Sequence, residues 1–260
     1  MTIRDTPWPD GTPCWVDLMV PDPRMAMDFY GALLAWDFAD QGDAYGNYLL
    51  CSVDGRQVAG IGGIPPDQQG MPAAWTTYLA TSDVDKAAAA ITESGGQIMM
   101  PAMDVGAMGR MAIATDPTGA VFGLWQAGEH HGVELANTVS ALTWNECITR
   151  DVERAKTFYG EVFGYEFDDM SGGGFTYLTL KVGGNVVGGL GELNAEAPAD
   201  VPAHWSAYFQ VADTDAAVAR AQELGGSLVR PAQDSPFGRL ATVTDNQGAH
   251  LVLIAVPDTA

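Results

Sequence analysis

Positive charge, cysteine and long apolar stretches are all scarce in this chain. Only 12 Lys and Arg residues accompany 33 Asp and Glu residues among 260, for a formal net charge of −21. A surface of that sign repels nucleic acid and anionic membranes, so neither is expected as a partner. Apolar runs such as 120–125 fall far short of the roughly 20 residues that a membrane-spanning helix needs.

The three cysteines, Cys14, Cys51 and Cys147, are odd in number and lack the CxxC spacing of metal sites and redox motifs. They are expected as buried thiols in a reducing compartment. The first segment, MTIRDTPWPDGTP, has no apolar stretch typical of a signal peptide. These features favour a soluble cytoplasmic protein. Hydrophobic residues make up 47% of the chain, enough for a folded core.

The chain repeats itself when it is shifted by 129 residues. Positions 15–62 then show 15 identities in 48 positions. The later parts, 75–104 and 205–234, match after a one-residue slip. Two homologous domains, 1–130 and 131–260, are therefore predicted. The identities in the first stretch include Trp15/Trp144, Asp22/Asp151, FYG at 29–31 and 158–160, Tyr48/Tyr177, and Gly60 and Gly62 over Gly189 and Gly191.

Each half is itself double. An aspartate (Asp22, Asp83, Asp151 or Asp213) precedes each of four amphipathic or Ala-rich stretches, where its carboxylate can cap the free N–H groups of a helix. A short strand precedes each helix, and glycine-punctuated strands follow it. The predicted unit is βαβββ, and it occurs near residues 11–66, 72–127, 138–193 and 201–256.

Tandem βαβββ modules, an FYG in the first helix and a DPTG turn before the last strand resemble the vicinal oxygen chelate superfamily of glyoxalases, extradiol dioxygenases and bleomycin-resistance proteins. PCWVDL, QIMMPAMDVGAMGRM, TDPTGAVFGLWQA and TWNE resemble more closely the actinobacterial two-domain glyoxalase-like proteins, which include a mycobacterial antigen and proteins often labelled hydroxylases. The resemblance implies an α+β fold in which four βαβββ modules form two glyoxalase-like cupped mixed β-sheets with flanking helices. Modules 1 with 2 and 3 with 4 are expected to pair, although 1 with 4 and 2 with 3 stays open.

Metal-dependent members of that superfamily carry a His on the first strand of a module and a Glu on the last. Trp15, Trp144, Thr76 and Ser206 stand at the His positions here, and Gly123 and Val252 at the Glu positions. None of these is a ligand that divalent metals prefer, so the sequence predicts no metal and no cofactor. His130 and His131, between the halves, are expected to be solvated.

Two carboxylates are the predicted catalytic residues. Strands alternate faces, so Asp17 lies on the face of Trp15, and Glu146 on the face of Trp144. If the superfamily register holds, that face lines the cavity. A carboxyl against indole in a dry pocket would have a raised pKa and could act as acid or base. Alternatively, each carboxylate only accepts hydrogen bonds from neighbouring strands.

Other residues are predicted to bind the ligand, each with a structural alternative. Met103 and Met108 belong to a flexible loop over the first cup, or they fill the core. The arginines of the two GR pairs face the cup, or they pair with Asp104 and Asp234. The ligand-binding set is Trp15, Trp144, Tyr78, Tyr208, His204, Ser206, Arg110, Arg239, Met103 and Met108.

Three functions remain open at this point. The first is metal-independent isomerase, lyase or cyclase-type chemistry on a small hydrophobic or aromatic metabolite, possible in secondary metabolism, with Glu146 or Asp17 moving the proton. The second is sequestration of a drug or metabolite, for which the aromatic wall and the net charge suit a planar cationic ligand. The third and weakest is glyoxalase activity. The sequence leans to an enzyme, as a monomer or a homodimer.

Overall fold

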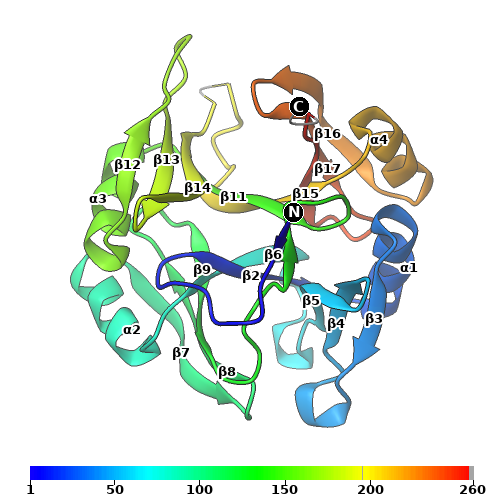
Figure 1. Ribbon diagram of the computed structural model, residues 1–260, viewed down its shortest axis with the longest axis horizontal. Helices are drawn as coiled ribbons and strands as arrows, with labels where there is room; N and C mark the ends of the chain where they lie inside the picture. Colours follow the sequence, from blue (N-terminus) through cyan, green and yellow to red (C-terminus); the bar gives the residue numbers. More distant parts are fainter. Residues whose placement is uncertain (195, 258–260) are drawn as a thin grey trace.

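The computed structural model describes residues 1–194 and 196–257, and it contains two curved sheets with helices at their sides (Figure 1). The first repeat comprises β2 (Pro13–Val20), α1 (Pro23–Leu34), β3 (Asp37–Asp40), β4 (Leu49–Val53), β5 (Arg56–Gly63), β6 (Ala74–Ala80), α2 (Val84–Glu93), β7 (Gln97–Val105), β8 (Gly109–Thr115) and β9 (Val121–Ala127). The second comprises β11 (Leu142–Thr149), α3 (Val152–Phe163), β12 (Glu166–Asp169), β13 (Tyr177–Val182), β14 (Asn185–Glu192), β15 (His204–Gln210), α4 (Thr214–Glu223), β16 (Ser227–Ser235), β17 (Gly238–Thr244) and β18 (His250–Ala255).

Modules 1 and 2 share one sheet, and modules 3 and 4 share the other. The strand order is β3-β4-β5-β2-β6-β9-β8-β7 in the first sheet and β12-β13-β14-β11-β15-β18-β17-β16 in the second. Both sheets mix parallel and antiparallel pairs, for example β2 with β5 and β2 with β6. The α+β fold with two glyoxalase-like repeats is therefore confirmed, and so is the pairing of modules 1 with 2 and 3 with 4.

The N-terminal segment of the chain crosses from the first repeat to the second. The short strand β1 (Thr2–Ile3) pairs with β10 (Leu135–Ala136), and β10 pairs with β11. The first residues of the chain therefore join the sheet of the second repeat. The division into domains at 130 and 131 stays a prediction. None of the helices within residues 1–194 and 196–257 combines the length and the apolarity needed to cross a membrane.

The four helices begin where the sequence predicts. Each of the four aspartates accepts a hydrogen bond from a backbone N–H in the first turn of its helix, as Asp151 does from Arg154 at 3.1 Å. These bonds satisfy donors that have no partner inside the helix. The helices lie outside the cups, with α1 against α4 and α2 against α3.

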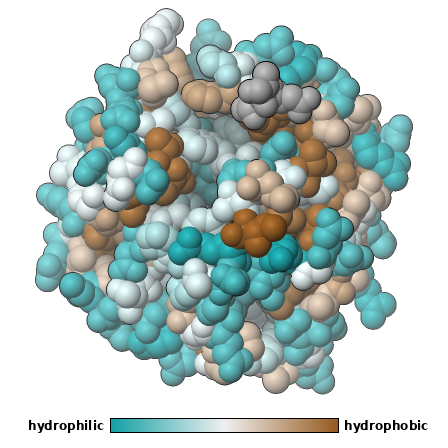
Figure 2. Space-filling model, viewed as in Figure 1, coloured by the Kyte–Doolittle hydropathy of each residue, from teal (hydrophilic) through white to brown (hydrophobic). Residues whose placement is uncertain are grey.

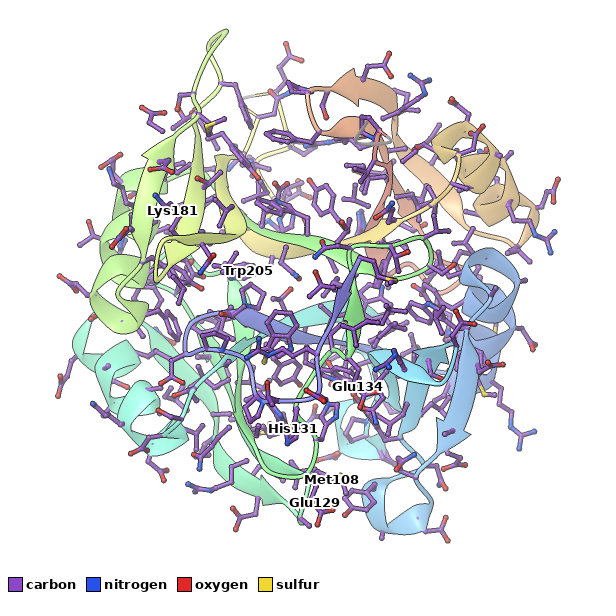
Figure 3. The ribbon with its side chains drawn as sticks, viewed as in Figure 1. Met108, Glu129, His131, Glu134, Lys181 and Trp205 are labelled. Carbon is purple, nitrogen blue, oxygen red and sulfur yellow. The ribbon has the colours of Figure 1, made fainter. Side chains whose placement is uncertain are left out.

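The core joins the two repeats. Tyr30 of α1 donates a hydrogen bond to Asp245 of the second repeat at 3.1 Å, and accepts one from Trp75 at 3.1 Å. The repeat-related Trp205 donates to Tyr159 at 2.8 Å, and Figure 3 shows Trp205 between the two sheets. The core consists of two large hydrophobic clusters, and each of them contains residues of both repeats.

Candidate functional site

The centre of each cup is a row of side chains that crosses neighbouring strands. In the first sheet Trp15 lies opposite Tyr78, and Tyr78 lies opposite Gly123. Asp17, two residues beyond Trp15, lies opposite Thr76. Tyr78 therefore lies level with Trp15 and Gly123 on the cup face, and Thr76 lies two residues along the same strand, beside Asp17.

In the first cup two tyrosines hold a buried carboxylate. The phenol of Tyr78 lies 3.1 Å from Asp17 Oδ2, and the phenol of Tyr48 lies 3.4 Å from the same oxygen. Trp15 Nε1 donates to the Tyr48 hydroxyl at 3.0 Å. Asp17 Oδ1 is buried and has no hydrogen-bond partner among the described residues. The result is an indole, phenol and carboxylate chain with one free acceptor.

The second cup repeats this arrangement around Glu146. Trp144 Nε1 donates to the Tyr177 hydroxyl at 2.9 Å, and Tyr177 donates to Glu146 Oε2 at 2.8 Å. Tyr208 donates to the other carboxylate oxygen, Oε1. Both oxygens of Glu146 therefore accept a phenol proton. In Asp17 both tyrosines lie near the same oxygen, whereas in Glu146, which is one methylene longer, each tyrosine donates to a different oxygen.

Glycines on the adjacent strand make room for these tyrosines. Gly60 lies opposite Asp17, and Gly189 lies opposite Glu146. A Cβ on Gly60 would lie 1.8 Å from the Tyr48 hydroxyl oxygen, and one on Gly189 would lie 2.0 Å from that of Tyr177. Any side chain at either position would collide with the phenol. The glycines at these two positions are thus needed to make room for the tyrosines, and not for the conformation of the strands.

Burial dominates the electrostatics of both carboxyls. Desolvation raises the pKa of Asp17 from 3.8 to about 7, although the bonds from Tyr78 and Tyr48 act in the opposite direction. Desolvation also raises the pKa of Glu146, against the lowering effect of Tyr208, Tyr177 and the charge of His204. Asp17 can therefore take and release a proton near neutral pH, and burial shifts the pKa of Glu146 in the same direction.

The first cup is closed by the segment that follows β9. His130 packs edge-on against Trp15 with ring centroids 4.3 Å apart and also contacts Trp125 at 5.4 Å. The segment is anchored because Trp125 Nε1 donates to the His130 carbonyl at 2.9 Å, and His130 N donates to the carbonyl of Met108 at 3.1 Å. Figure 3 shows Glu129 of this segment beside Met108 of the turn between β7 and β8. The expectation of a solvated His130 is therefore wrong.

The second cup has no such cover among the described residues. Trp15 is 3% exposed, whereas its counterpart Trp144 is only half-buried, as is Tyr177. Figure 2 shows the surface hollowed over the strands of the second sheet. Tyr208, Leu240, Val252 and Ile254 pack beside Trp144 as a small apolar wall. The second cup thus combines an apolar wall, a buried carboxyl and access from outside.

The remaining predicted ligand residues divide between the cup and other places. Ser206 pairs with Glu146, and His204 pairs with Ile148, so both share the cup face of the second sheet. Met108 is half-buried in the core beside the closing segment, and Met103 is 47% exposed on β7. Only the positions of these side chains are shown, and their roles in binding stay predictions.

The two predicted arginines lie on the opposite face. Arg110 pairs with Asp85 of α2 at 2.6 Å and with Asp104 at 2.7 Å. The second repeat has the same arrangement, in which Arg239 pairs with Asp215 of α4 at 2.6 Å and with Asp234 at 3.0 Å. Alternation along β8 and β17 turns these side chains toward the helices. The assignment of Arg110 and Arg239 to the cups is therefore corrected to the structural alternative.

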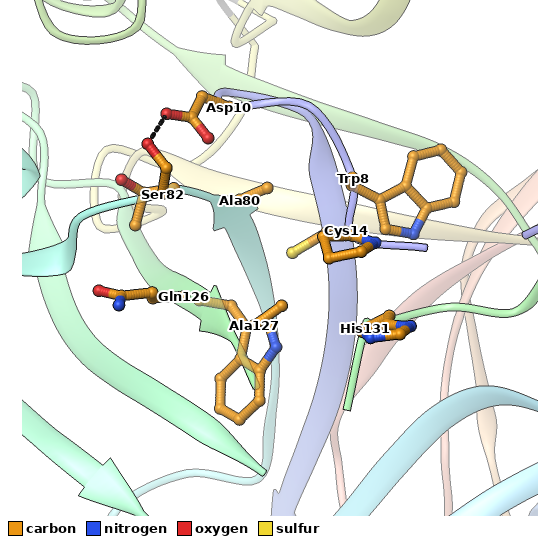
Figure 4. A pocket seen from close by; sticks show the side chains of 11 residues that line it. Trp8, Asp10, Cys14, Ala80, Ser82, Gln126, Ala127 and His131 are labelled. Atoms are coloured by element: carbon orange, nitrogen blue, oxygen red, sulfur yellow. Dashed lines mark hydrogen bonds between the residues drawn. The ribbon is translucent and has the colours of Figure 1, made fainter. Parts of the chain in front are cut away.

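Two further cavities lie away from the carboxyls. One, of about 280 Å³, lies between the N-terminal segment and the ends of β6 and β9 (Figure 4), where Ser82 donates to Asp10 at 2.6 Å. The other, of about 320 Å³, lies near Arg150 and Pro202. The first is lined by the buried thiol of Cys14, whose pKa burial raises, but neither is lined by a buried carboxyl, so the carboxyl chemistry lies in the cups.

Tyr48, Tyr177 and His130 are the site residues that sequence reasoning missed. The identity of Tyr48 with Tyr177, together with that of Gly60 with Gly189, was the available signal. A repeated tyrosine and a repeated glycine on neighbouring strands indicate a ring lying over a bare backbone. His130 had no such signal, because its seat depends on how the connecting segment folds back.

The chain matches the family model described as the Glyoxalase/Bleomycin resistance protein/Dioxygenase superfamily over residues 14–124 and again over 141–253. It belongs to this superfamily. CFP32 of Mycobacterium tuberculosis, provisionally named a glyoxylase, is 42% identical over 244 residues, which cover 92% of each chain. The anthracycline biosynthesis protein DnrV of Streptomyces peucetius is 36% identical over 252 residues, which cover 92% of this chain and 91% of DnrV.

Solved structures share the fold at low sequence identity. The Mn(II)-bound glyoxalase from Novosphingobium aromaticivorans has a TM-score of 0.65 at 12% identity, over 95% of this chain and 82% of its own. The 2,2',3-trihydroxybiphenyl 1,2-dioxygenase from Sphingomonas wittichii has a TM-score of 0.64 at 12% identity, over 95% of this chain and 91% of its own. These likenesses concern the fold alone.

The cups of this chain do not suit the metal that such superfamily members bind. The row at the metal position offers an indole, a phenol and either Gly123 or Val252. One carboxyl is nearby in each cup, and burial keeps the phenols protonated, since it raises the pKa of Tyr78 and Tyr208. No three His, Cys, Asp or Glu side chains within the described ranges gather as metal ligands do.

Proposed function

We propose that the second cup binds a small hydrophobic or aromatic metabolite and that Glu146 moves a proton on it without a metal. The observation that carries the proposal is a buried carboxyl, held between two phenols at the floor of an uncovered apolar cup. Its raised pKa allows it to act as a base or, once protonated, as an acid. Isomerase, lyase or cyclase-type steps need only such transfers.

In this proposal the neighbours of Glu146 have defined tasks. Tyr177 and Tyr208 orient the carboxylate and stabilise its negative charge, and Trp144 holds Tyr177 through its indole N–H. Proton transfer needs one of the phenols to give way or to relay the proton to the ligand. The relationship to DnrV supports a polycyclic aromatic ketone of secondary metabolism as the substrate class.

Sequestration of such a molecule is the second candidate. Both oxygens of Glu146 are already occupied by phenol protons, which favours a fixed carboxylate that orients a ligand and does not react with it. The apolar wall would then supply most of the affinity.

One experiment separates these candidates. The probe is an anthracycline aglycone that carries a ketone, incubated with the protein in D2O. Exchange at the carbon next to the carbonyl is followed by mass spectrometry, and affinity by tryptophan quenching. Glu146→Gln keeps the shape of the side chain but removes its charge, and Asp17→Asn is the matched control in the closed cup. Catalysis predicts that Glu146→Gln lowers the exchange rate by roughly 10²–10⁴-fold and the affinity by less than tenfold.

The other outcomes are equally distinct. If the wild-type protein binds the probe without exchange, and Glu146→Gln weakens binding, the protein sequesters its ligand. If Glu146→Gln changes only the melting temperature, Glu146 is structural and the proposal is wrong. Asp17→Asn is expected to leave both exchange and affinity unchanged.

A further inference from the structure

The two cups are copies of one another, so their differences show what the second has acquired. Antiparallel and parallel pairs place one residue from each of five strands in a single row on the cup face. In the second cup this row contains, in order from β16 to β11, Arg230, Thr242, Val252, Tyr208 and Trp144. In the first cup the matching row contains Met100, Ile113, Gly123, Tyr78 and Trp15.

Three positions of the second cup carry nitrogen bases or a cation where the first cup is apolar. Arg230 replaces Met100 at the outer end of the row. His250 lies two residues before Val252, at the position of Val121, because Val252 and Gly123 are the matching row members. His204 pairs with Ile148 at the position where Ala74 pairs with Met19.

These groups lie close enough to act on the floor of the cup. The charge of His204 opposes the burial that raises the pKa of Glu146, and it adds to the burial that lowers the pKa of His250. Arg230 opposes the burial that raises the pKa of Tyr208. None of the ion pairs within residues 1–194 and 196–257 involves Arg230. Several other arginines also lie outside these pairs, but Arg230 is the one of them that lies in the row of the second cup.

Arg230 is a cation on the concave face of a molecule of net charge −21, whereas burial lowers the pKa of His250 and so favours its neutral imidazole. The chain has only 12 Lys and Arg residues and 4 His residues at a net charge of −21, yet one Arg and two His lie on the face of one cup. A guanidinium outside the ion pairs of the described residues, on the same concave face as two imidazoles that can donate hydrogen bonds, can bind a carboxylate or an ionised phenol or enol.

We infer that the second cup recognises an aromatic ligand through an anionic oxygen, held at the rim by Arg230, His204 and His250 while the aromatic body lies against Trp144. This rests on the proposed function, in that the second cup is the ligand site. Arg230 lies on β16 and Glu146 on β11, four strands apart in the sheet, so an anion bound at Arg230 does not meet the carboxylate at the floor. The inference replaces a cationic ligand, which the net charge alone had favoured, by an anionic one.

The test compares two probes of equal size and opposite charge, 2-naphthoate and 2-naphthylmethylammonium, by calorimetry at pH 7 and low salt. Wild-type protein is expected to bind 2-naphthoate at least about tenfold more tightly than the ammonium compound. Arg230→Met, which installs the first cup's own residue, is expected to weaken 2-naphthoate by roughly 10- to 100-fold, the range of one charge-assisted hydrogen bond. His204→Ala combined with His250→Val should weaken it further in the same direction.

Arg220→Met removes the same charge from the exposed side of α4 and is expected to change neither affinity. Equal binding of the two probes, a preference for the ammonium compound, no binding of 2-naphthoate, or no effect of Arg230→Met would each overturn the inference. If Glu146→Gln alters aglycone exchange while Arg230→Met leaves 2-naphthoate unchanged, the inference fails and the proposed function stands. If Arg230→Met acts as expected and Glu146→Gln is silent, the proposed catalysis fails and the anion site stands.

Discussion

Each buried carboxyl depends on a residue without a side chain. The hydroxyls of Tyr48 and Tyr177 occupy the space where a Cβ on Gly60 or Gly189 would lie, and from there they reach Asp17 and Glu146. The carboxyls differ in their supply of partners. Glu146 has a phenol on each oxygen, whereas Asp17 Oδ1 has none within the described residues. The negative charge of Asp17 is therefore stabilised by fewer hydrogen-bonded oxygens than that of Glu146, although Asp17 lies in the closed cup.

That difference predicts a pH dependence of stability. Because the pKa of Asp17 rises from 3.8 to about 7 on folding, the folded state holds its proton more tightly, and stability falls as the pH rises through this window. Asp17→Asn removes this loss. The melting temperature of the variant relative to wild type is expected to increase between pH 5 and pH 8, measured by circular dichroism. A difference that is constant with pH would show that Asp17 does not titrate in this range.

At the scale of elements, two sheets with the same strand order form one closed and one open cup. The difference lies in the segment that follows the first sheet. The segment after β9 folds back, hydrogen-bonds to Met108 and seats His130 between Trp15 and Trp125. Burial lowers the pKa of His130 to about 4, so the imidazole is neutral in its seat. The side chain thus covers Trp15 as a fixed, neutral ring.

Removing that imidazole should open the first cup. His130→Ala is expected to expose Trp15 and to allow the first cup to take up water, whereas His131→Ala, at the neighbouring half-buried position, should not. The readout is ¹⁹F NMR of protein labelled with 5-fluorotryptophan, in which the Trp15 signal is assigned by Trp15→Phe. A larger solvent isotope shift of that signal in His130→Ala is the expected result. An unchanged signal would mean that the backbone of 128–132 alone closes the cup.

The parts of the fold that sequence could predict are those that repeat. The identities at Trp15/Trp144, and the aspartates before the four helices, are local patterns that recur in each module, so they predict the modules and the carboxyls. The seat of His130 and the position of Arg230 depend on long-range register and on a β-bulge in β16. The face of Arg110 was misjudged because its pairing with α2 does not follow from spacing alone.

The whole molecule adds a constraint that neither repeat contains by itself. Phe209 of β15 is fully buried. Its ring centroid lies 5.4 Å from that of Trp36 and 5.0 Å from that of Trp75, and both tryptophans belong to the other repeat. The repeats therefore share interior, because the largest hydrophobic cluster contains residues of both, and each repeat buries part of its apolar back against the other.

This shared interior predicts cooperative unfolding of both repeats. Phe209→Ala leaves a cavity between Trp36 and Trp75 and is expected to lower the free energy of unfolding by about 3–5 kcal/mol. Urea unfolding, followed by the ¹⁹F signals of Trp15 and Trp144, should show one transition in wild type and an equal shift of both signals in the variant. Phe237→Ala, at a position that is 58% exposed, is the control and should shift neither. Separate transitions, with only the Trp144 signal displaced, would mean that the repeats are independent domains, because a loss confined to one repeat would then leave the other at its own stability.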